Sequence, residues 1–304
     1  MSPVVVFGFP GHEGLARKLA DGMVANDMAA TNGEMLLRRF PDGETYVRLD
    51  SPVDGHRVIL ACGLDHPDDR AMGLLFAAAT ARELGATQVG IVAPYLGYMR
   101  QDARFQPGEA VTSRHFARML SQHADWLLTV DPHLHRYRSL DEIYSIPSVV
   151  VPAAPVIAAW IAANVARPLL VGPDVESEQW VAEVARLAGA PHVVMSKTRH
   201  GDREVEIARS DFSAWSDRTP VLVDDIISTA RTMAAAAKRL VEAGLQKPVC
   251  IGVHALFSPD ALALLETGAA HVATCNTIAH VTNAIDMAPA MIDAVIEVLR
   301  RKQA

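Results

Sequence analysis

The chain alternates between short apolar runs and longer segments in which apolar residues recur at helical spacing. Runs rich in Val, Ile and Leu predict strands, here at residues 4–9, 57–62, 88–94 and 126–131. Between and after them, amphipathic helices are predicted at residues 14–23, 69–84 and 113–123. Strands that alternate with helices are typical of a parallel, doubly wound sheet, so the pattern predicts the α/β class.

The same alternation begins again after a proline-rich stretch near residue 150. Strands are predicted at residues 169–172, 192–195, 205–208, 221–223, 248–257 and 271–274. Helices are predicted from residue 154 and at residues 178–188, 233–240, 260–265 and 288–301. We therefore expect two α/β domains of similar size, residues 1–148 and residues 149–304.

Composition narrows the function classes. Half of the 304 residues are hydrophobic and the net charge is −7, with no basic run longer than the three residues from Arg300. Nucleic-acid binding needs clustered positive charge, so we expect no nucleic-acid partner. No basic leader and no apolar run of membrane-spanning length occurs, which favours a soluble cytoplasmic protein without a membrane partner. Cys62, Cys250 and Cys275 are far apart in the sequence and have no metal-type spacing, so we expect buried thiols and no disulfide framework.

The most informative stretch follows the strand at residues 221–223. Asp224 and Asp225 stand directly behind this apolar run, a short polar turn follows, and helical spacing resumes at Met233. A loop that leads from a strand into a helix aims backbone N–H groups and the positive end of the helix dipole at an anion. Together with two carboxylates that accept hydroxyl hydrogen bonds, this favours a sugar-phosphate site over simple capping of the helix.

A second polar stretch interrupts the pattern at residues 95–112. It holds two tyrosines, two arginines and a Gln-Asp pair directly after a strand, which is a surface able to stack on a base and bind phosphates. The alternative, a merely solvated loop, is less favoured, because four aromatic and arginine residues directly after a buried strand would be an odd choice for one.

Other candidate groups are weaker when each is taken alone. His133 follows the strand that ends at Asp131, and Asp174 follows the strand at residues 169–172, so either side chain suits a metal or phosphate, although a histidine there is more often structural. Lys197 and Arg199 are two cations suited to a reacting phosphate, or an ordinary surface charge pair. The segment at residues 39–44 has hairpin-turn chemistry.

In their order and spacing these groups resemble the ribose-phosphate diphosphokinases, the phosphoribosyl pyrophosphate synthetases. The resemblance rests on Phe-Pro-Asp-Gly-Glu, Pro-Tyr-x-Gly-Tyr-x-Arg-Gln-Asp, Asp-x-His, Pro-Asp, Lys-x-Arg and Val-Asp-Asp-Ile-Ile-x-Thr, and it covers nearly the whole chain. It implies two phosphoribosyltransferase-like domains, with ATP on the first and ribose 5-phosphate on the second. The implied reaction moves the pyrophosphoryl group of MgATP to the 1-hydroxyl of ribose 5-phosphate. It also implies a homo-oligomer whose subunits share an adenine pocket.

The resemblance implies a role for each matching residue. Lys197 and Arg199 would form the catalytic arm, and Mg²⁺ would lie near His133 and Asp174. The ATP side would comprise Phe40, Asp42, Glu44, Arg100, Gln101, Asp102 and His133, the first three reaching adenine from a neighbouring subunit. The ribose 5-phosphate side would comprise Asp224, Asp225, Ser228, Thr229, Ala230, Arg231 and Thr232.

The chain departs from the family pattern in the phosphate loop. Ala230 and Arg231 stand where two glycines are usual, and glycine allows backbone conformations that other residues resist. A Gln that commonly follows the Asp-x-His is absent, with Leu134, His135 and Arg136 in that stretch. Two other functions share parts of the pattern: a phosphoribosyltransferase, and a non-catalytic regulatory homologue that binds nucleotide.

Overall fold

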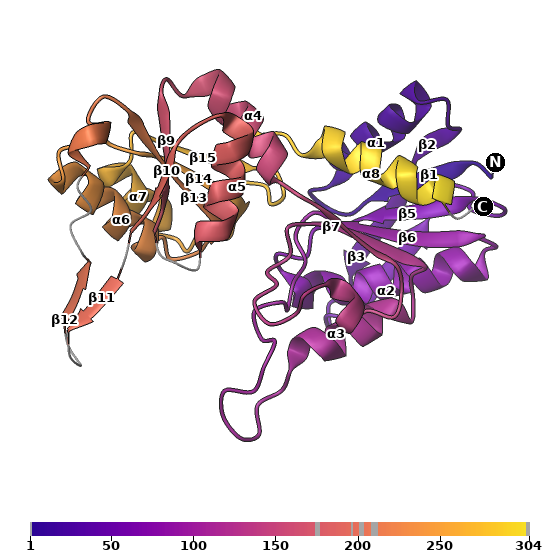
Figure 1. Cartoon of the computed structure of the whole chain (residues 1–304). Coiled ribbons are helices and arrows are strands. Elements are labelled where there is room, and N and C mark those ends of the chain that lie inside the picture. Colours follow the sequence, from indigo (N-terminus) through magenta and orange to yellow (C-terminus); the bar gives the residue numbers. More distant parts are fainter. Residues whose placement is uncertain (1, 174–176, 196, 201–203, 208–211, 302–304) are drawn as a thin grey trace. The chain divides into compact units, whose positions relative to one another are not determined.

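The computed structural model describes residues 2–173, 177–195, 197–200, 204–207 and 212–301. These residues form two compact units (Figure 1). The first unit runs to Val151 and takes in the last helix, α8 (Ala288–Arg301), while the second runs from Pro152 to Met287. No helix in the described ranges combines the length and the apolar composition needed to cross a membrane.

The first unit is built on a six-stranded parallel sheet in the order β2, β1, β5, β6, β7, β8. Its strands are β1 (Val4–Gly8), β2 (Ala30–Gly33), β5 (Arg57–Ala61), β6 (Gln88–Ala93), β7 (Trp126–Val130) and β8 (Ser148–Val151). The sequence pattern does not predict the two edge strands, β2 and β8, because each has only four residues and most of them are at least partly exposed.

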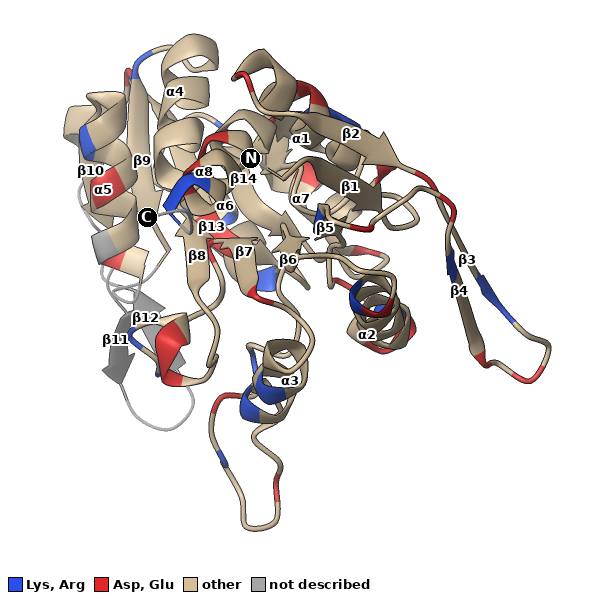
Figure 2. Ribbon diagram, turned by 90° about the vertical axis from the view of Figure 1, so that its right-hand side faces the viewer, with Lys and Arg blue, Asp and Glu red and all other residues tan. Residues whose placement is uncertain are grey.

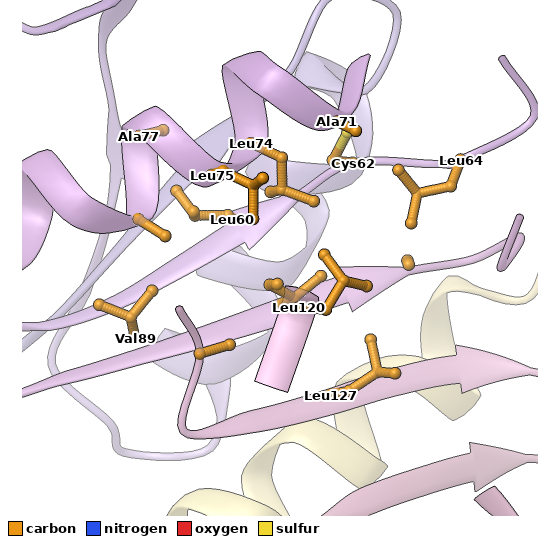
Figure 3. Close-up of a cluster of buried hydrophobic side chains, with 14 of the residues drawn as sticks. Leu60, Cys62, Leu64, Ala71, Leu74, Leu75, Ala77, Val89, Leu120 and Leu127 are labelled. Carbon is orange, nitrogen blue, oxygen red and sulfur yellow. The ribbon is translucent and has the colours of Figure 1, made fainter. Parts of the chain in front are cut away.

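Helices cover both faces of this sheet, as the sequence predicted (Figure 1). On one face lie α1 (Glu13–Ala25) and α8, and on the other lie α2 (Pro67–Glu83) and α3 (Thr112–Ser121). A buried cluster fills the space beneath α2 and α3 (Figure 3); it includes Leu60, Val89, Leu127, Leu74, Leu75 and Leu120. Each fully buried leucine stabilises the unit by about 1.5–3 kcal/mol relative to an exposed one.

An antiparallel hairpin extends from the first unit beside α2. It pairs β3 (Met35–Arg39) with β4 (Thr45–Leu49), and the turn between them contains Gly43 at φ 94°. This confirms the hairpin predicted from the turn residues, since glycine alone adopts such a φ without strain. Leu37 packs against the first core, and Arg39 forms an ion pair with Asp69 of α2.

The second unit repeats the architecture of the first. Its parallel sheet has the order β10, β9, β13, β14, β15, β16. The strands are β9 (Pro168–Gly172), β10 (His192–Val194), β13 (Thr219–Ile227), β14 (Val249–Ala255), β15 (His271–Cys275) and β16 (Asn283–Ile285). The flanking helices are α4 (Ala154–Asn164), α5 (Glu178–Ala188), α6 (Arg231–Glu242) and α7 (Ala261–Gly268). The α/β class with two parallel sheets is therefore confirmed.

Residues 197–200 and 204–207 form a further antiparallel pair rather than part of the main sheet. Strand β11 (Lys197–His200) pairs with β12 (Glu204–Ile207), with Lys197 opposite Ile207 and Arg199 opposite Val205. The sequence predicted a strand near β12 but none at β11, because Lys-Thr-Arg-His has no apolar alternation.

The last helix belongs to the first unit, whereas the sequence analysis counted it with residues 149–304. Met291, Val295 and Leu299 recur every fourth residue along α8 and are all buried. Gly22 of α1 allows close approach, since a side-chain carbon there would lie 2.7 Å from Ile292 of α8. Helical periodicity shows that α8 has an apolar face, but it does not show which sheet that face covers.

A buried arginine holds the end of α8 in place. Arg57 is 7% exposed, its Nε donates to the Ser2 carbonyl at 3.2 Å, and its Nη1 donates to the Leu299 carbonyl at 3.2 Å. The last carbonyls of a helix have no partner within the helix, so a buried donor stabilises them. Burial lowers the pKa of Arg57 from its usual value.

We expect Arg57→Met to lower the free energy of unfolding of the first unit by about 2–4 kcal/mol, because the Ser2 carbonyl and the buried Leu299 carbonyl lose their donor. Urea unfolding measures the change. Arg48→Met is the matched control, because Arg48 is exposed on the hairpin, and it should leave the unfolding midpoint unchanged. Equal midpoints for wild type and Arg57→Met would contradict the assigned role.

Candidate functional site

The second sheet divides at its first strand. From β9 the chain proceeds to β10 on one side and to β13 on the other. In open α/β sheets, ligands bind beside the carboxyl ends of the two strands where this reversal occurs. The pairing of β13 with β9 ends at Leu222, while the pairing of β13 with β14 continues to Ile227. The last residues of β13 therefore extend beyond its pairing with β9.

Asp224 and Asp225 lie on this overhanging part of β13. The sequence placed them in a loop behind the strand, but both are residues of the strand itself, and Asp224 pairs with Gly252 of β14. Adjacent strand residues point to opposite faces, so the two carboxylates diverge. The amide of Asp225 donates to Asp224 Oδ1 at 3.0 Å, and the amide of Ile226 donates to Asp225 Oδ1 at 2.7 Å. These bonds fix the orientation of both carboxylates, which are only partly buried.

A three-residue turn of Ser228, Thr229 and Ala230 connects β13 to α6. Ala230 has φ 60° and ψ 1°, the left-handed conformation that the usual glycine would adopt readily. The Ser258 amide donates to the Ser228 carbonyl at 3.1 Å, which ties the turn to the loop after β14. Arg231 and Thr232 are exposed in the first turn of α6, where the helix dipole favours an anion.

The remaining predicted residues of the second unit are Asp174, Lys197 and Arg199. Asp174 lies outside the described residues. Lys197 and Arg199 are described as part of the backbone of β11. Among the residues that the structure describes, no group of three or more His, Cys, Asp or Glu side chains is arranged to hold a metal.

The first sheet has the same reversal, between β1 and β5, but there it is filled by protein. His12 accepts a hydrogen bond at Nε2 from the Gly63 amide at 3.0 Å, and Arg70 donates to the Gly63 carbonyl and to Asp65. The Asp65 and Arg70 side chains are 10% and 24% exposed. In the first sheet this position is therefore occupied by the cluster of His12, Gly63, Asp65 and Arg70.

The polar stretch after β6 uses its two tyrosines, Tyr95 and Tyr98, in contacts within the fold. Tyr95 is 7% exposed, and the ring of Tyr98 packs on Phe116 with 4.7 Å between ring centroids. The Tyr98 hydroxyl donates to Asp68, and this hydrogen bond raises the pKa of Tyr98. Both tyrosines therefore serve the fold, and the expectation that they form a stacking surface for a base is corrected.

The Arg-Gln-Asp segment lies between β6 and α3. Arg100 is exposed, whereas the Gln101 side chain accepts from the Thr112 hydroxyl at 3.0 Å and thereby joins the start of α3. The Asp102 side chain is 4% exposed and forms an ion pair with Arg136 at 2.8 Å. Sequence reasoning did not single out Arg136. Its only signal was that it stands in the stretch where the family pattern usually has a Gln.

His133 lies in the loop after β7, and its ring contacts that of His135 with 4.1 Å between centroids. Further along the same loop, the Tyr137 hydroxyl donates to the Asp102 carbonyl at 3.2 Å. The loop that carries His133 is thus joined to the Arg-Gln-Asp segment, and these two predicted groups lie together.

The hairpin turn carries the third group of the first unit. Phe40 is 38% exposed, and the Asp42 carboxylate accepts from the Glu44 amide at 3.1 Å. The Arg38 guanidinium lies 4.4 Å from the ring centroids of both Phe40 and Tyr46, a contact that sequence reasoning missed. In Figure 2 the hairpin points away from α3, so the structure does not bring its turn next to the Arg-Gln-Asp segment of the same subunit.

Comparison with known proteins gives the same division into two parts. Residues 4–123 match the family described as the N-terminal domain of ribose phosphate pyrophosphokinase, and residues 139–289 match the phosphoribosyl transferase domain. The chain is 33% identical to a ribose-phosphate pyrophosphokinase of Methanopyrus kandleri over 284 residues, which covers 92% of this chain and 94% of the relative. It is 32% identical to one of Halobacterium salinarum over 279 residues, covering 89% and 96%.

A solved structure shares the fold. The phosphoribosylpyrophosphate synthetase of Mycobacterium smegmatis superposes with a TM-score of 0.84 at 23% identity, and the alignment covers 98% of this chain and 99% of that one. The fold of two phosphoribosyltransferase-like domains is therefore confirmed.

We expect Ala230→Gly to change the stability of the second unit by less than about 0.5 kcal/mol. Glycine relieves the strain of the left-handed backbone at this position. This gain in stability offsets two losses, the packing of the methyl group and the greater conformational freedom that glycine gives to the unfolded chain. Ala235→Gly is the matched control, because Ala235 is exposed within α6, and it should cost about 1 kcal/mol in urea unfolding. A larger loss for Ala230→Gly than for Ala235→Gly would show that its conformation is not strained.

We also expect stability to fall with acidification through His12. Burial, followed by the positive charge of Arg70, lowers the pKa of His12 below its usual value. Below about pH 6.5 the unfolded chain therefore binds a proton that the folded chain resists, and stability is lost as the pH falls. Relative to wild type, His12→Gln should remove a slope of at most about 1.4 kcal/mol per pH unit in urea unfolding. His115→Gln, at an exposed position on α3, is the matched control for the loss of an imidazole.

Proposed function

The chain belongs to the ribose-phosphate pyrophosphokinase family, and we propose that it transfers the pyrophosphoryl group of MgATP to the 1-hydroxyl of ribose 5-phosphate. The products are AMP and 5-phosphoribosyl 1-diphosphate. The observation that carries the proposal is the reversal of the second sheet at β9, where Asp224 and Asp225 of the neighbouring strand β13 precede a turn into the N-terminus of α6. Carboxylates for hydroxyl groups and helix amides for a phosphate are what a phosphorylated sugar requires.

On the sugar side, Asp224 and Asp225 bind the ribose hydroxyls. The 5-phosphate lies at the turn and at the first residues of α6, that is Ser228, Thr229, Ala230, Arg231 and Thr232. The left-handed φ of Ala230 supports this assignment, because the turn keeps a glycine-like conformation although the glycine is absent. This favours an active enzyme over a non-catalytic homologue.

On the nucleotide side, Arg100, Gln101 and His133 bind ATP, and Asp102 serves the same loop through its ion pair with Arg136. Arg100 is exposed and provides a guanidinium for the polyphosphate. A phosphoribosyltransferase has no use for this loop, which is a reason to prefer the synthetase.

Phe40, Asp42 and Glu44 contact the adenine of a neighbouring subunit in a homo-oligomer. The half-exposed ring of Phe40 and the direction of the hairpin, away from α3 of its own subunit, support this arrangement (Figure 2). An exposed aromatic ring at the end of a hairpin suits stacking on a base.

The chemistry is an in-line displacement. The 1-hydroxyl oxygen of the sugar attacks the β-phosphorus of ATP and loses its proton, while the bond between the β-phosphorus and the oxygen bridging to the α-phosphate breaks and AMP leaves. Lys197 and Arg199 offset the charge that develops on the transferring oxygens.

Mg²⁺ fits this site because protein ligands supply only part of its coordination in phosphoryl transfer, and substrate phosphates and water complete it. A full protein cage is therefore not required, in line with its absence among the described residues. His133 and Asp174 are the residues proposed to lie beside the ion, which neutralises phosphate charge when bound.

Purified protein with Mg²⁺, ATP and ribose 5-phosphate should release AMP in a sugar-dependent manner. Lys197→Ala should raise the barrier by about 2–4 kcal/mol, a loss of roughly thirtyfold to a thousandfold in kcat. Lys238→Ala is the control, because Lys238 is exposed on α6 with its ammonium group near Glu242, and it should keep wild-type activity.

Other products decide between the alternatives. ATP binding without turnover would indicate the regulatory homologue, ADP as the product would indicate an ordinary kinase, and either result overturns the proposal. An unchanged kcat in Lys197→Ala would contradict the catalytic role assigned to Lys197.

A further inference from the structure

Arg136 makes two contacts to the loop between β6 and α3. Its Nη1 donates to Asp102 Oδ1 at 2.8 Å, and its guanidinium carbon lies 5.0 Å from the ring centroid of Phe105. The two contacts use the charge of the guanidinium and its planar face, which a lysine cannot combine. Arg136 therefore joins the loop after β7 to two points of the loop after β6.

Burial makes the contact to Asp102 significant. The Asp102 side chain is 4% exposed, and within the described part of the chain its Oδ2 is buried without a hydrogen-bond partner. A buried carboxylate is costly unless a cation compensates it, and removal of one partner of such a pair leaves an uncompensated charge. The backbone around Asp102 thus depends on Arg136.

The second contact holds a loop that is already folded on itself. The Glu109 carboxylate accepts from the amides of Phe105 and Gln106 at 2.7 and 3.1 Å, and Arg104 donates to the Glu109 carbonyl at 2.8 Å. Phe105 is 64% exposed, so little other packing holds its ring. The guanidinium of Arg136 therefore attaches this closed loop to the body of the unit.

We propose that Arg136 is a positioning residue for the nucleotide: it clamps the loop at residues 102–109 so that the adjoining Arg100 and Gln101 are held ready for ATP. The inference rests on the proposed function, and it adds a residue that lies outside the family motifs. A clamp that orders the binding loop before ATP arrives reduces the conformational entropy that the loop loses when ATP binds. Loss of the clamp therefore weakens the affinity for ATP more than it lowers kcat.

The test compares Arg136→Met with Arg138→Met. Arg138 is exposed two residues away, so its substitution makes the same change of charge outside the clamp. We expect Arg136→Met to raise the KM for ATP about tenfold, with kcat and the KM for ribose 5-phosphate within about twofold of wild type. Arg136→Lys should recover part of the loss, because it restores the charge but not the stacked plane. Arg138→Met should behave as wild type.

A double substitution separates a clamp from direct contact with ATP. Phe105→Leu should raise the KM for ATP on its own, and it should add nothing to Arg136→Met, because the clamp is already open. Additive effects would assign Arg136 to direct phosphate binding and would overturn the positioning role. An unchanged KM for ATP in Arg136→Met would overturn it as well.

Proteolysis gives a readout that does not depend on activity. Chymotrypsin should cleave after Phe105 about tenfold faster in Arg136→Met than in wild type or Arg138→Met, because the loop opens more often. Equal cleavage rates would overturn the clamp. If the wild-type protein released no AMP, the proposed function would fail, whereas the cleavage rates would still decide whether Arg136 holds the loop.

Discussion

The reversal of chain direction at the first strand of each sheet is the constraint on which the rest of the structure depends. The first strand lies inside the sheet, and the chain adds one strand on one side and the remaining strands on the other. Parallel pairing requires every crossover to return to the same end of the sheet. The loops after the two central strands therefore diverge at the carboxyl end, and the space between them is open unless side chains fill it.

The two units use this space in opposite ways. In the first unit, His12 and Arg70 occupy it with hydrogen bonds to the backbone at Gly63, and Asp65 accepts from Arg70. In the second unit, β13 extends past its pairing with β9 and presents Asp224 and Asp225 beside a turn into α6. One topology thus holds a hydrogen-bonded cluster in one half and, in the proposed function, the sugar-phosphate position in the other.

Charge burial organises the loops after β6 and β7 in the first unit. Asp102 belongs to a motif that suggests direct contact with ATP, yet its side chain is almost fully buried against Arg136. A carboxylate in that position stabilises a particular loop conformation, because its charge is compensated only when the loops after β6 and β7 are in contact. The same logic applies to Arg57, whose buried guanidinium joins the end of α8 to the start of the first sheet.

The sequence by itself determined the α/β class, the two-part organisation, the central strands and helices, and the candidate residues at strand ends. Apolar periodicity is a local property, and turns such as the one at Gly43 are specified by the residues within them. Tertiary structure alone decided that α8 covers the first sheet, that Asp224 and Asp225 lie within β13, and that Tyr95 and Tyr98 serve the core. It also revealed Arg136 as the partner of Asp102, 34 residues away in the chain. These features depend on which distant surfaces meet, and burial or ion pairing between distant residues leaves no periodic signal in the sequence.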